Sequence, residues 1–430
     1  MFVKWPNKQS RAPGTAAGWD DLRAHNTALL FDAIWNEDGI SRADLARFSG
    51  LSRATVSDIV AEFLAAGAVT ESEVAPSSGG RPPIRLRFED GWRHLIGVEM
   101  GASHVSGVRT DLRGRVLGQF HRDQDIGGDP EGTVAAIDHG IRELMRLDGT
   151  VPVLGVGVGV PSPLRAADEG RLAPHLFPRW SGVDLAGHLG RVHGLPIRMD
   201  NDANLGALAE HWWGAGQDVS DFAYIKVATG VGAGILIGGQ IYRGATGIAG
   251  EIGHTTIDMR GPRCRCGLNG CLEAMVGSAS LLELAGDRVA RMAIPPVWFE
   301  GSPSVRSLTA GAHAGDLVAR ELIAGAGTAL GIAIANLLNL VNPGRVILGG
   351  HLTEAGALLL DPVRDAIARR ALWSSVEGST LVISPLGDRA VALGAATLLL
   401  QSLLDDPRGL LEAAPLHSQL VSAASATTPA

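Results

Sequence analysis

The chain contains very little cysteine, and this limits the class of protein that it can be. Its three cysteines, Cys264, Cys266 and Cys271, lie within eight positions of one another. An odd number of cysteines clustered this tightly does not match the disulfide framework of a secreted protein. The clustering indicates metal ligands instead.

The sequence also lacks a secretion signal and an excess of positive charge. The N-terminal segment MFVKWPNKQSRAPGTAAGW carries cations but no apolar core, so we expect no Sec-type signal peptide and a cytoplasmic protein. The chain has 37 Lys and Arg residues against 45 Asp and Glu, a net charge of -8. This balance argues against non-specific binding to nucleic acid or anionic membranes, although one domain could still carry a basic face.

What the chain does contain predicts a large folded protein. Its 430 residues are enough for about three domains, and 46% hydrophobic with 19% charged residues does not match a disordered chain. The longest apolar stretch, Leu322 to Val341, is nearly long enough to cross a bilayer. Its Ala and Gly content, with Asn336 and Asn339, indicates a buried helix.

Shifts in composition divide the chain. Residues 1–20 and 405–430 are rich in small and polar residues and are predicted to be disordered tails. Residues 21–74 have a helical period, and SSGGRPP at 77–83 interrupts it shortly before a domain boundary near residue 90. Beyond that boundary, apolar strand-like runs with glycines alternate with helical stretches, which predicts an α/β fold.

The N-terminal segment contains the pattern of a helix-turn-helix. Ser41 with Asp44 predicts the start of one helix, which ends at Gly50, and Ser52 predicts the start of a second helix, which runs to Gly67. The apolar face of the second helix is Val56, Ile59, Val60, Phe63 and Leu64. Two short helices joined by a tight glycine turn are typical of this DNA-binding motif. The polar face offers small hydrogen-bonding and cationic side chains at its start, among them Arg53, Thr55 and Ser57.

The segment after these helices predicts a wing. Residues 68–88 fit two short strands around a Gly-Pro tip, and they carry Arg81, Arg85 and Arg87. Residues 1–90 hold ten Lys and Arg against twelve Asp and Glu, a net charge of -2. DNA binding would therefore depend on the placement of the cations rather than on bulk charge. A small helical bundle that contacts another protein is the alternative.

The cysteines and a nearby histidine form a candidate metal site. His254, Cys264, Cys266 and Cys271 offer one imidazole and three thiolates, which suits tetrahedral zinc. Four protein ligands leave no open position, so the predicted zinc is structural. Three free thiols in a reducing compartment are the alternative.

Two further motifs are weak when taken separately. ATGVGAGILIGG at 228–239 offers glycines whose amides could approach an anion or a sugar, but such turns also serve tight packing. LPIRMDNDANLGALAE predicts a strand entering a helix, with Asn201 and Asp202 at the junction. These two residues could cap the helix, or they could hold sugar hydroxyls, with the carboxylate accepting a hydroxyl proton.

Together these motifs resemble the ROK (repressor, open reading frame, kinase) family, and specifically its transcriptional regulators, over nearly all of residues 21–403. The motifs are GLSRATVSDIV and GGRPP of the winged helix-turn-helix, NDAN at 201–204, and GATGIAGEIGH followed by CRCGLNGCLE. The resemblance implies a winged head at 21–90 and an actin-like ATPase (sugar kinase) fold with two α/β lobes around a cleft. The implied lobes are 91–205, with 388–404 returning to it, and 206–387, which carries the zinc loop.

The resemblance also implies functional roles. Asp202 would be the general base if the protein were a kinase, and His254 would bind both zinc and sugar. The implied sugar-binding residues are Asn201, Asp202, Glu251, His254 and Glu273. The nucleotide side departs from the family pattern D-x-G-x-T, because the chain has Glu99-Met100-Gly101-Ala102-Ser103, whose carboxylate is one methylene longer. Ala228 also replaces the first glycine of the second phosphate motif, so ATP is a doubtful cofactor.

The leading hypothesis is a cytoplasmic, sugar-responsive transcriptional regulator, more often a repressor in this family, and not an enzyme. Its expected partners are operator DNA and a small sugar, with no membrane, and its expected state is a homodimer or homotetramer. Arg53, Thr55 and Ser57 would face the major groove, and Arg81 would reach the adjacent minor groove. An active sugar kinase and a module that senses a sugar phosphate are the alternatives.

Overall fold

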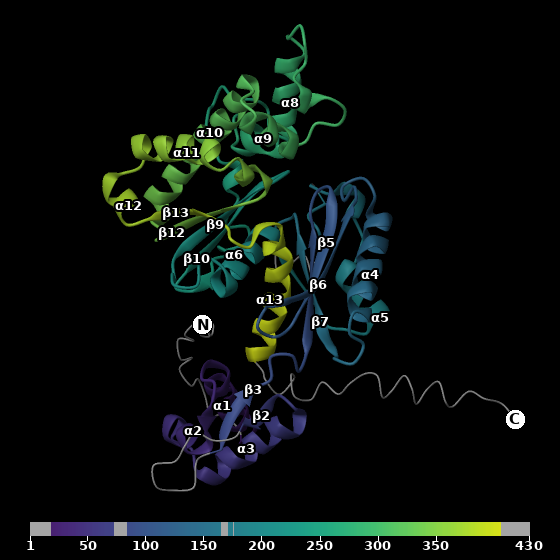
Figure 1. The fold of residues 1–430 in the computed structure, drawn as a ribbon, viewed down its shortest axis with the longest axis vertical. Coiled ribbons are helices and arrows are strands. Elements are labelled where there is room, and N and C mark those ends of the chain that lie inside the picture. Colours follow the sequence, from purple (N-terminus) through teal and green to yellow (C-terminus); the bar gives the residue numbers. More distant parts are fainter. Residues whose placement is uncertain (1–18, 73–83, 165–170, 175, 406–430) are drawn as a thin grey trace, which may run out of the picture.

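A computed structural model of the chain describes residues 19–72, 84–164, 171–174 and 176–405. These residues form a small N-terminal head and two larger α/β lobes, with the head at the bottom of Figure 1 in purple and the second lobe at the top. The predicted tip of the wing, including Arg81, lies outside the described residues.

The head consists of three helices and a small sheet among the described residues. In chain order its elements are α1 (Trp19–Asn36), β1 (Ile40–Ser41), α2 (Arg42–Ser49), α3 (Arg53–Ala66), β2 (Val69–Ser72) and β3 (Arg85–Phe88). The strands pair antiparallel in the order β1-β3-β2. This arrangement is the predicted helix-turn-helix followed by the two strands of the wing.

Local interactions explain where the two helices of the motif begin and end. The Ser41 hydroxyl accepts a hydrogen bond from the Asp44 amide (3.2 Å), and the Asp44 carboxylate accepts one from the Ser41 amide (3.1 Å). Gly50 ends α2 with φ +71°, a backbone conformation that favours glycine. Ser52 caps α3 by accepting from the Thr55 amide. The predicted apolar face of α3 is buried, although its last member, Leu64, is only half-buried.

The first lobe contains a five-stranded sheet in the order β6-β5-β4-β7-β8. Its elements are β4 (His94–Met100), β5 (His104–Thr110), β6 (Val116–Asp123), α4 (Pro130–Arg146), β7 (Val153–Val160), α5 (Leu185–His193) and β8 (Ile197–Asn201). Strands β4, β5 and β6 form an antiparallel meander, and β7 and β8 run parallel to β4. The long helix α6 (Asp202–Trp213) follows β8 directly.

The second lobe repeats this topology. Its sheet has the order β11-β10-β9-β12-β13, again a meander followed by two parallel strands. Its strands are β9 (Phe222–Val227), β10 (Val231–Ile237), β11 (Gln240–Ile241), β12 (Arg345–Gly349) and β13 (Thr380–Ile383). Its helices are α7 (Glu273–Val276), α8 (Ser278–Val289), α9 (Val305–His313), α10 (Leu317–Val341), α11 (Ala357–Arg370) and α12 (Trp373–Glu377). Strands β4 and β9 therefore hold the same central place in their lobes.

The last described helix, α13 (Ala390–Asp405), is the yellow ribbon beside the first sheet in Figure 1, and it packs on β4 and β7. Glycines permit this close contact. A Cβ atom at Gly97 or Gly157 would lie 1.8 Å from the carbonyl oxygen of Ala392 or Ala395, respectively. Only a residue without a side chain fits beneath the helix at these two positions.

Two features of the core matter for function. One hydrophobic cluster is continuous from the head into the first lobe, because Trp35 and Phe88 belong to it together with Leu95 and Leu404. In the second lobe, α10 is long and apolar enough to cross a membrane. However, 67% of its most apolar 18-residue stretch is buried inside the protein. It packs against α9 and α11, as expected for the predicted buried helix.

Candidate functional site

A cleft of about 670 Å³ lies between the two lobes. The turn after β4, the turn after β9 and the junction of β8 with α6 all contribute to its walls. The five residues that the sequence analysis assigned to a sugar site line this one cleft: Asn201, Asp202, Glu251, His254 and Glu273.

Asn201 and Asp202 hold the start of α6 and also face the cleft. The Asn201 side-chain oxygen accepts from the amides of Ala203 (3.0 Å) and Asn204 (3.3 Å), so this residue is the helix cap. The Asp202 Oδ1 atom also accepts from the Ala203 amide, at 2.8 Å. The capping role and a place in the cleft are therefore combined in the same two residues.

A lysine that the sequence analysis did not single out lies beside Asp202. The Lys226 Nζ atom donates to Asp202 Oδ2 (2.9 Å) and to Glu99 Oε1 (2.6 Å). Burial alone would lower the pKa of Lys226, but the carboxylates of Asp202 and Glu99 raise it well above its ordinary value. Burial alone would raise the pKa of Glu99, but Lys226 and His104 hold it at about 2. All three groups of this ion cluster, on strands of both lobes and on α6, are largely buried.

A second ion pair joins the lobes next to Asn201. Arg243, in the loop after β11, donates to both carboxylate oxygens of Asp200 on β8, at 2.9 and 2.6 Å. Asp200 is buried, and its Oδ1 atom also accepts from the Asn201 amide at 2.7 Å. Asn201 is thus held by its own helix and is linked to Arg243 of the second lobe only through Asp200.

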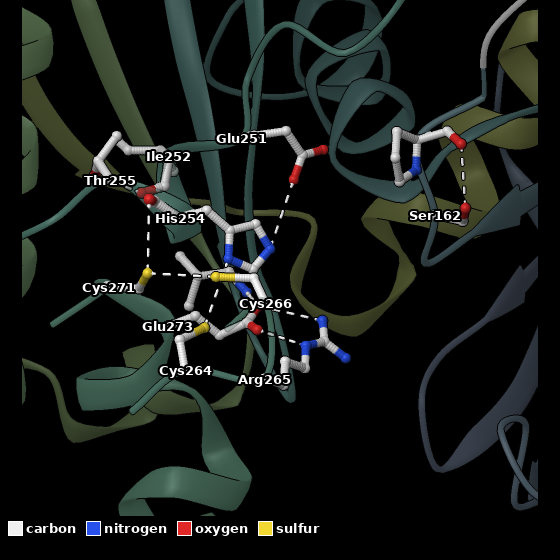
Figure 2. Close-up of polar contacts among 12 residues, drawn as sticks. Ser162, Glu251, Ile252, His254, Thr255, Cys264, Arg265, Cys266, Cys271 and Glu273 are labelled. Carbon is white, nitrogen blue, oxygen red and sulfur yellow. Dashed lines mark hydrogen bonds and ion pairs between the residues drawn. The ribbon is translucent and has the colours of Figure 1, made fainter. Parts of the chain in front are cut away.

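Glu251 and Glu273 lie on the second-lobe side of the cleft. Burial raises the pKa of Glu251 above its ordinary value, and the nearby His254 partly opposes this effect. The Glu273 carboxylate accepts from the Val231 amide (3.0 Å) and from Arg265 Nε (2.7 Å). Figure 2 shows the Arg265 side chain directed at Glu273 from the loop that carries the cysteines.

The four predicted metal ligands converge. Their ligand atoms all lie within 4.8 Å of one another in the group His254, Cys264, Cys266 and Cys271. Sulfur atoms of Cys266 and Cys271 are 3.7 Å apart, and the Cys264 sulfur is 3.7 Å from His254 Nδ1. A tetrahedral zinc ion with metal–sulfur bonds of about 2.3 Å separates its ligands by about 3.8 Å. The donor set and its spacing therefore fit zinc.

His254 connects the cysteine cluster to the cleft. Figure 2 shows its imidazole between the cysteine sulfurs and the Glu251 carboxylate. The Nδ1 atom faces Cys264, and the Nε2 atom lies 4.0 Å from Glu251 Oε2. With Nδ1 as the metal ligand, the proton of a neutral imidazole resides on Nε2, which then is a hydrogen-bond donor toward the cleft.

The first hairpin, where the sequence departs from the phosphate motif, is covered by a histidine. Gly101 and His104 close the turn through an amide-to-carbonyl bond of 2.9 Å. A Cβ atom on Gly101 would lie 2.2 Å from the His104 ring, so this imidazole packs directly on the turn. Its Nε2 atom also lies 3.9 Å from Glu99. The space over this turn is therefore partly filled by a side chain of the protein.

The predicted DNA-contacting residues lie at the start of α3. Arg53 and Ser57 are exposed, whereas Thr55 is half-buried and its hydroxyl shares a 2.9 Å hydrogen bond with that of Ser52. The predicted basic face of the wing is partly neutralised in this structure. Arg87 pairs with Asp38 (3.1 Å), and Arg85 donates to the carbonyl of Gly39 (3.1 Å).

The sequence motifs did not identify two cationic residues of the site, Lys226 and Arg265. Lys226 is a cation in the otherwise apolar strand FAYIKV, and Arg265 stands between two of the predicted metal ligands in CRC. A charged side chain within a buried strand requires a partner of opposite charge. The lysine in FAYIKV could therefore have been recognised from the sequence as part of a buried ion pair. The identity of its partners depended on strands far apart in the chain.

Comparisons with known proteins agree with this arrangement. The model of the ROK family matches residues 95–402. The xylose repressor of Caldicellulosiruptor bescii is 32% identical over 395 residues, which cover 90% of this chain and 98% of that protein.

Solved structures resemble the whole chain or its two lobes. A ROK family transcriptional regulator, a homologue of the Escherichia coli MLC protein, aligns with a TM-score of 0.75 and 28% identity, covering 91% of this chain and 98% of that one. A ROK family glucokinase from Streptomyces griseus, in complex with glucose and AMPPNP, aligns with a TM-score of 0.63 and 29% identity. The glucokinase alignment covers 71% of this chain and 98% of the glucokinase.

Proposed function

The chain belongs to the ROK family, and we propose that it is a sugar-responsive transcriptional repressor that binds operator DNA through its head and a sugar in its cleft. The observation that carries this proposal is the presence, in one chain, of a helix-turn-helix head and a sugar-kinase-like cleft joined by a continuous core. The xylose repressor is similar along 98% of its own length, so the similarity includes its N-terminal part.

In this proposal α3 is the recognition helix. Its exposed start would enter the major groove, where Arg53 donates to base edges or phosphates and Ser57 hydrogen-bonds beside it. Thr55 would contribute through a hydroxyl that Ser52 already orients. Arg81, at the tip of the wing, would reach the adjacent minor groove.

The cleft would bind a sugar through directional polar groups. Asp202, Glu251 and Glu273 supply acceptors for hydroxyl protons, and the Asn201 amide group and His254 Nε2 supply donors. Several of these groups are fixed by bonds within the protein, which lowers the entropic cost of holding a polyol. Binding would favour one arrangement of the lobes and thereby change the position of the head.

We propose that His254, Cys264, Cys266 and Cys271 hold a structural zinc ion. When bound, zinc would supply four strong bonds that order the loop between η3 (Ile252–His254) and α7, where little apolar surface is buried. The ordered loop would present Arg265 to the cleft, and the same ion would fix His254 at the end of η3. The four protein ligands leave no position for a reacting group, so no chemistry is assigned to the metal.

The proposed working form is a cytoplasmic homodimer or homotetramer. Repressors with a helix-turn-helix commonly bind two half-sites as dimers, so the spacing between two heads would be the property that a sugar changes. No membrane is involved in this proposal, and α10 serves as a core helix.

A sugar kinase is the second candidate, and the likeness to the glucokinase supports it. Asp202 would then be the general base that takes the proton of a sugar hydroxyl. Two contacts weigh against this function. Lys226 already binds the Asp202 carboxylate, and His104 covers the turn at Gly101.

The test is a fluorescence-anisotropy titration of the full-length protein against the DNA upstream of its own gene, at fixed salt. The titration is repeated with D-xylose, D-glucose and N-acetyl-D-glucosamine, and with a scrambled DNA of equal length. We expect tight binding to the upstream DNA that one of the sugars weakens. Equal binding to both DNAs, indifferent to every sugar, would contradict the proposal, and ADP release in a coupled assay with these sugars would then favour the kinase.

A further inference from the structure

Glu99 and Lys226 occupy matching positions in the two lobes. Each is the penultimate residue of the central strand of its sheet, β4 for Glu99 and β9 for Lys226. Each is also in register with a glycine on the adjacent parallel strand, Gly159 on β7 and Gly349 on β12. The repeated topology thus places an acid and a base at equivalent points, and they meet between the two lobes at 2.6 Å.

Asp202 adds a second carboxylate to this contact. One oxygen of Glu99 and one of Asp202 bond to the same Lys226 nitrogen at 2.6 and 2.9 Å, so these oxygens are no more than 5.5 Å apart. Two ionised carboxylates this close repel each other unless a cation lies between them. Mg²⁺ is commonly held in such places by one or two carboxylates together with the phosphates of a substrate. Here the cation belongs to the protein.

We propose that the Lys226 ammonium permanently occupies the cation position between Glu99 and Asp202, so that the cleft holds a sugar without a divalent metal at that position. The inference deepens the proposed function and rests on it for the presence of a sugar, but its test requires neither a sugar nor DNA.

The same contact changes what Asp202 does. Its Oδ1 atom accepts from the Ala203 amide and its Oδ2 atom accepts from the Lys226 ammonium. An oxygen that already accepts a charged hydrogen bond is a poorer proton acceptor, yet it retains a lone pair for a hydroxyl donor. Lys226 is therefore a positioning residue that keeps Asp202 as a hydrogen-bond acceptor for the sugar instead of a base.

A purely structural salt bridge makes a different prediction. If Lys226 only stabilised the contact between the lobes, its neutralisation would lower the stability of the protein, because a buried carboxylate would be left without its partner. It would not create a binding site for a metal. If Lys226 fills a cation site, its neutralisation leaves the carboxylates of Glu99 and Asp202 with no cation between them. Such a variant gains affinity for a divalent metal.

The experiment is a titration of full-length, zinc-loaded protein with Mn²⁺, followed by electron paramagnetic resonance. Lys226→Met removes the charge and keeps the length of the side chain, and the double variant Lys226→Met/Glu99→Gln removes one carboxylate as the matched control. Lys226→Arg keeps a cation in place. A surface cluster that could also bind Mn²⁺ is unchanged in every variant and gives a common background: His351, Glu354 and Asp388.

We expect Lys226→Met to gain a Mn²⁺ site that binds at least about tenfold more tightly than any site of the wild type. The double variant loses that site, and Lys226→Arg behaves as the wild type. A folded Lys226→Met that gains no site would overturn the proposal, as would a wild-type site that Glu99→Gln abolishes. If Lys226→Met does not fold, Lys226→Gln replaces it. If the proposed sugar-responsive function is wrong, the DNA titration will show it. The Mn²⁺ titration uses neither sugar nor DNA, so its result tests the role of Lys226 independently.

Discussion

The Arg113 guanidinium lies 4.0 Å above the Trp35 ring and donates to the Trp35 carbonyl at 2.7 Å. Trp35 belongs to α1 of the head, and Arg113 belongs to the turn between β5 and β6 of the first lobe. The same guanidinium also donates to Asp90, just after β3, at 2.9 Å. The Arg113 side chain of the first lobe therefore contacts both helix α1 of the head and the segment just after strand β3.

A continuous path of packed residues leads from the cleft to this contact. Helix α6 begins at Asp202 in the cleft and ends at Trp213, whose ring packs against Gly114, the neighbour of Arg113. Trp213 also donates from its ring nitrogen to Thr397 of α13, at 2.7 Å. Spatial continuity alone does not establish coupling, and a measurement on Arg113 tests it.

Arg113→Gln is expected to uncouple sugar binding from DNA release. The variant keeps the cleft, so its sugar affinity should equal that of the wild type, but a sugar should weaken operator binding far less than the roughly 5- to 150-fold typical of allosteric coupling. Arg115→Gln is the matched control, because Arg115 is in the same turn, is exposed and pairs only with Asp111 among the described residues. Both affinities are measured by anisotropy and calorimetry. Normal release by Arg113→Gln would exclude this contact as the connection.

Arg53→Ala is expected to weaken operator binding by roughly 5- to 150-fold, the effect of losing about 1–3 kcal/mol of contact free energy. The slope of affinity against salt concentration should also decrease if Arg53 contacts a phosphate. Arg47→Ala is a suitable control in the same motif, because Arg47 is exposed and already pairs with Asp44. Sugar affinity should not change in either variant. Equal loss in both variants would mean that α3 has no special role.

Cys266→Ser is expected to lower the zinc content of the purified protein and to reduce sugar affinity by about 10- to 100-fold, since His254 loses the metal that orients it. The thermal midpoint should also fall by about 5 °C or more. The variant Arg260→Gln, in the same loop with an exposed side chain, should change none of these properties. Zinc is measured by atomic emission and sugar affinity by calorimetry. If the variant lacks zinc but keeps its sugar affinity, the metal does not contribute to sugar binding in the cleft.

His94 should make the protein less stable as the pH falls from about 6.5 to 4. Burial, with the nearby Arg109 as a second cause, lowers the pKa of His94 to about 4, while an unfolded histidine titrates near 6.5. The unfolded chain therefore binds a proton first, so this contribution to stability is complete above pH 6.5 and is lost as pH falls through the folded pKa.

His94→Asn should reduce this pH dependence, because its side-chain oxygen can replace the Nδ1 atom that accepts from Arg109 Nε at 2.9 Å and does not titrate. The measurement is the thermal midpoint at half-unit steps between pH 7 and pH 4. His121→Asn, at an exposed histidine of the same sheet, should retain the wild-type profile. Identical pH profiles for His94→Asn and the wild type would refute the assignment.

Local patterns in the sequence were enough to predict the helix-turn-helix of the head and several strands of the lobes. Ser41, Asp44, Gly50 and Ser52 act through bonds to residues three or four positions away, so their roles are visible in the chain itself. The apolar strand runs and the buried helix α10 were recognisable for the same reason. The predicted metal group also required little tertiary information, because three of its ligands lie within one short loop.

Contacts between distant strands could not be predicted in this way. Lys226 is separated from Glu99 by 127 positions, and Arg113 from Trp35 by 78. No periodicity relates such residues, so only the repeated topology of the two sheets and the packing of the head reveal them. Arg87 is a case in the opposite direction, because the sequence suggested a basic face and the fold pairs it with Asp38.

The amino-acid sequence alone predicted the helix-turn-helix, several strands of the lobes and the candidate zinc ligands, and its motifs carried the resemblance to the ROK family, which in turn implied the sugar-binding residues. These properties depend on backbone preference and side-chain chemistry over short separations. The tertiary structure decided which charges meet, because a buried carboxylate or ammonium must find its partner wherever the fold places one. Lys226 between Glu99 and Asp202 therefore exists as a functional group only in the folded molecule.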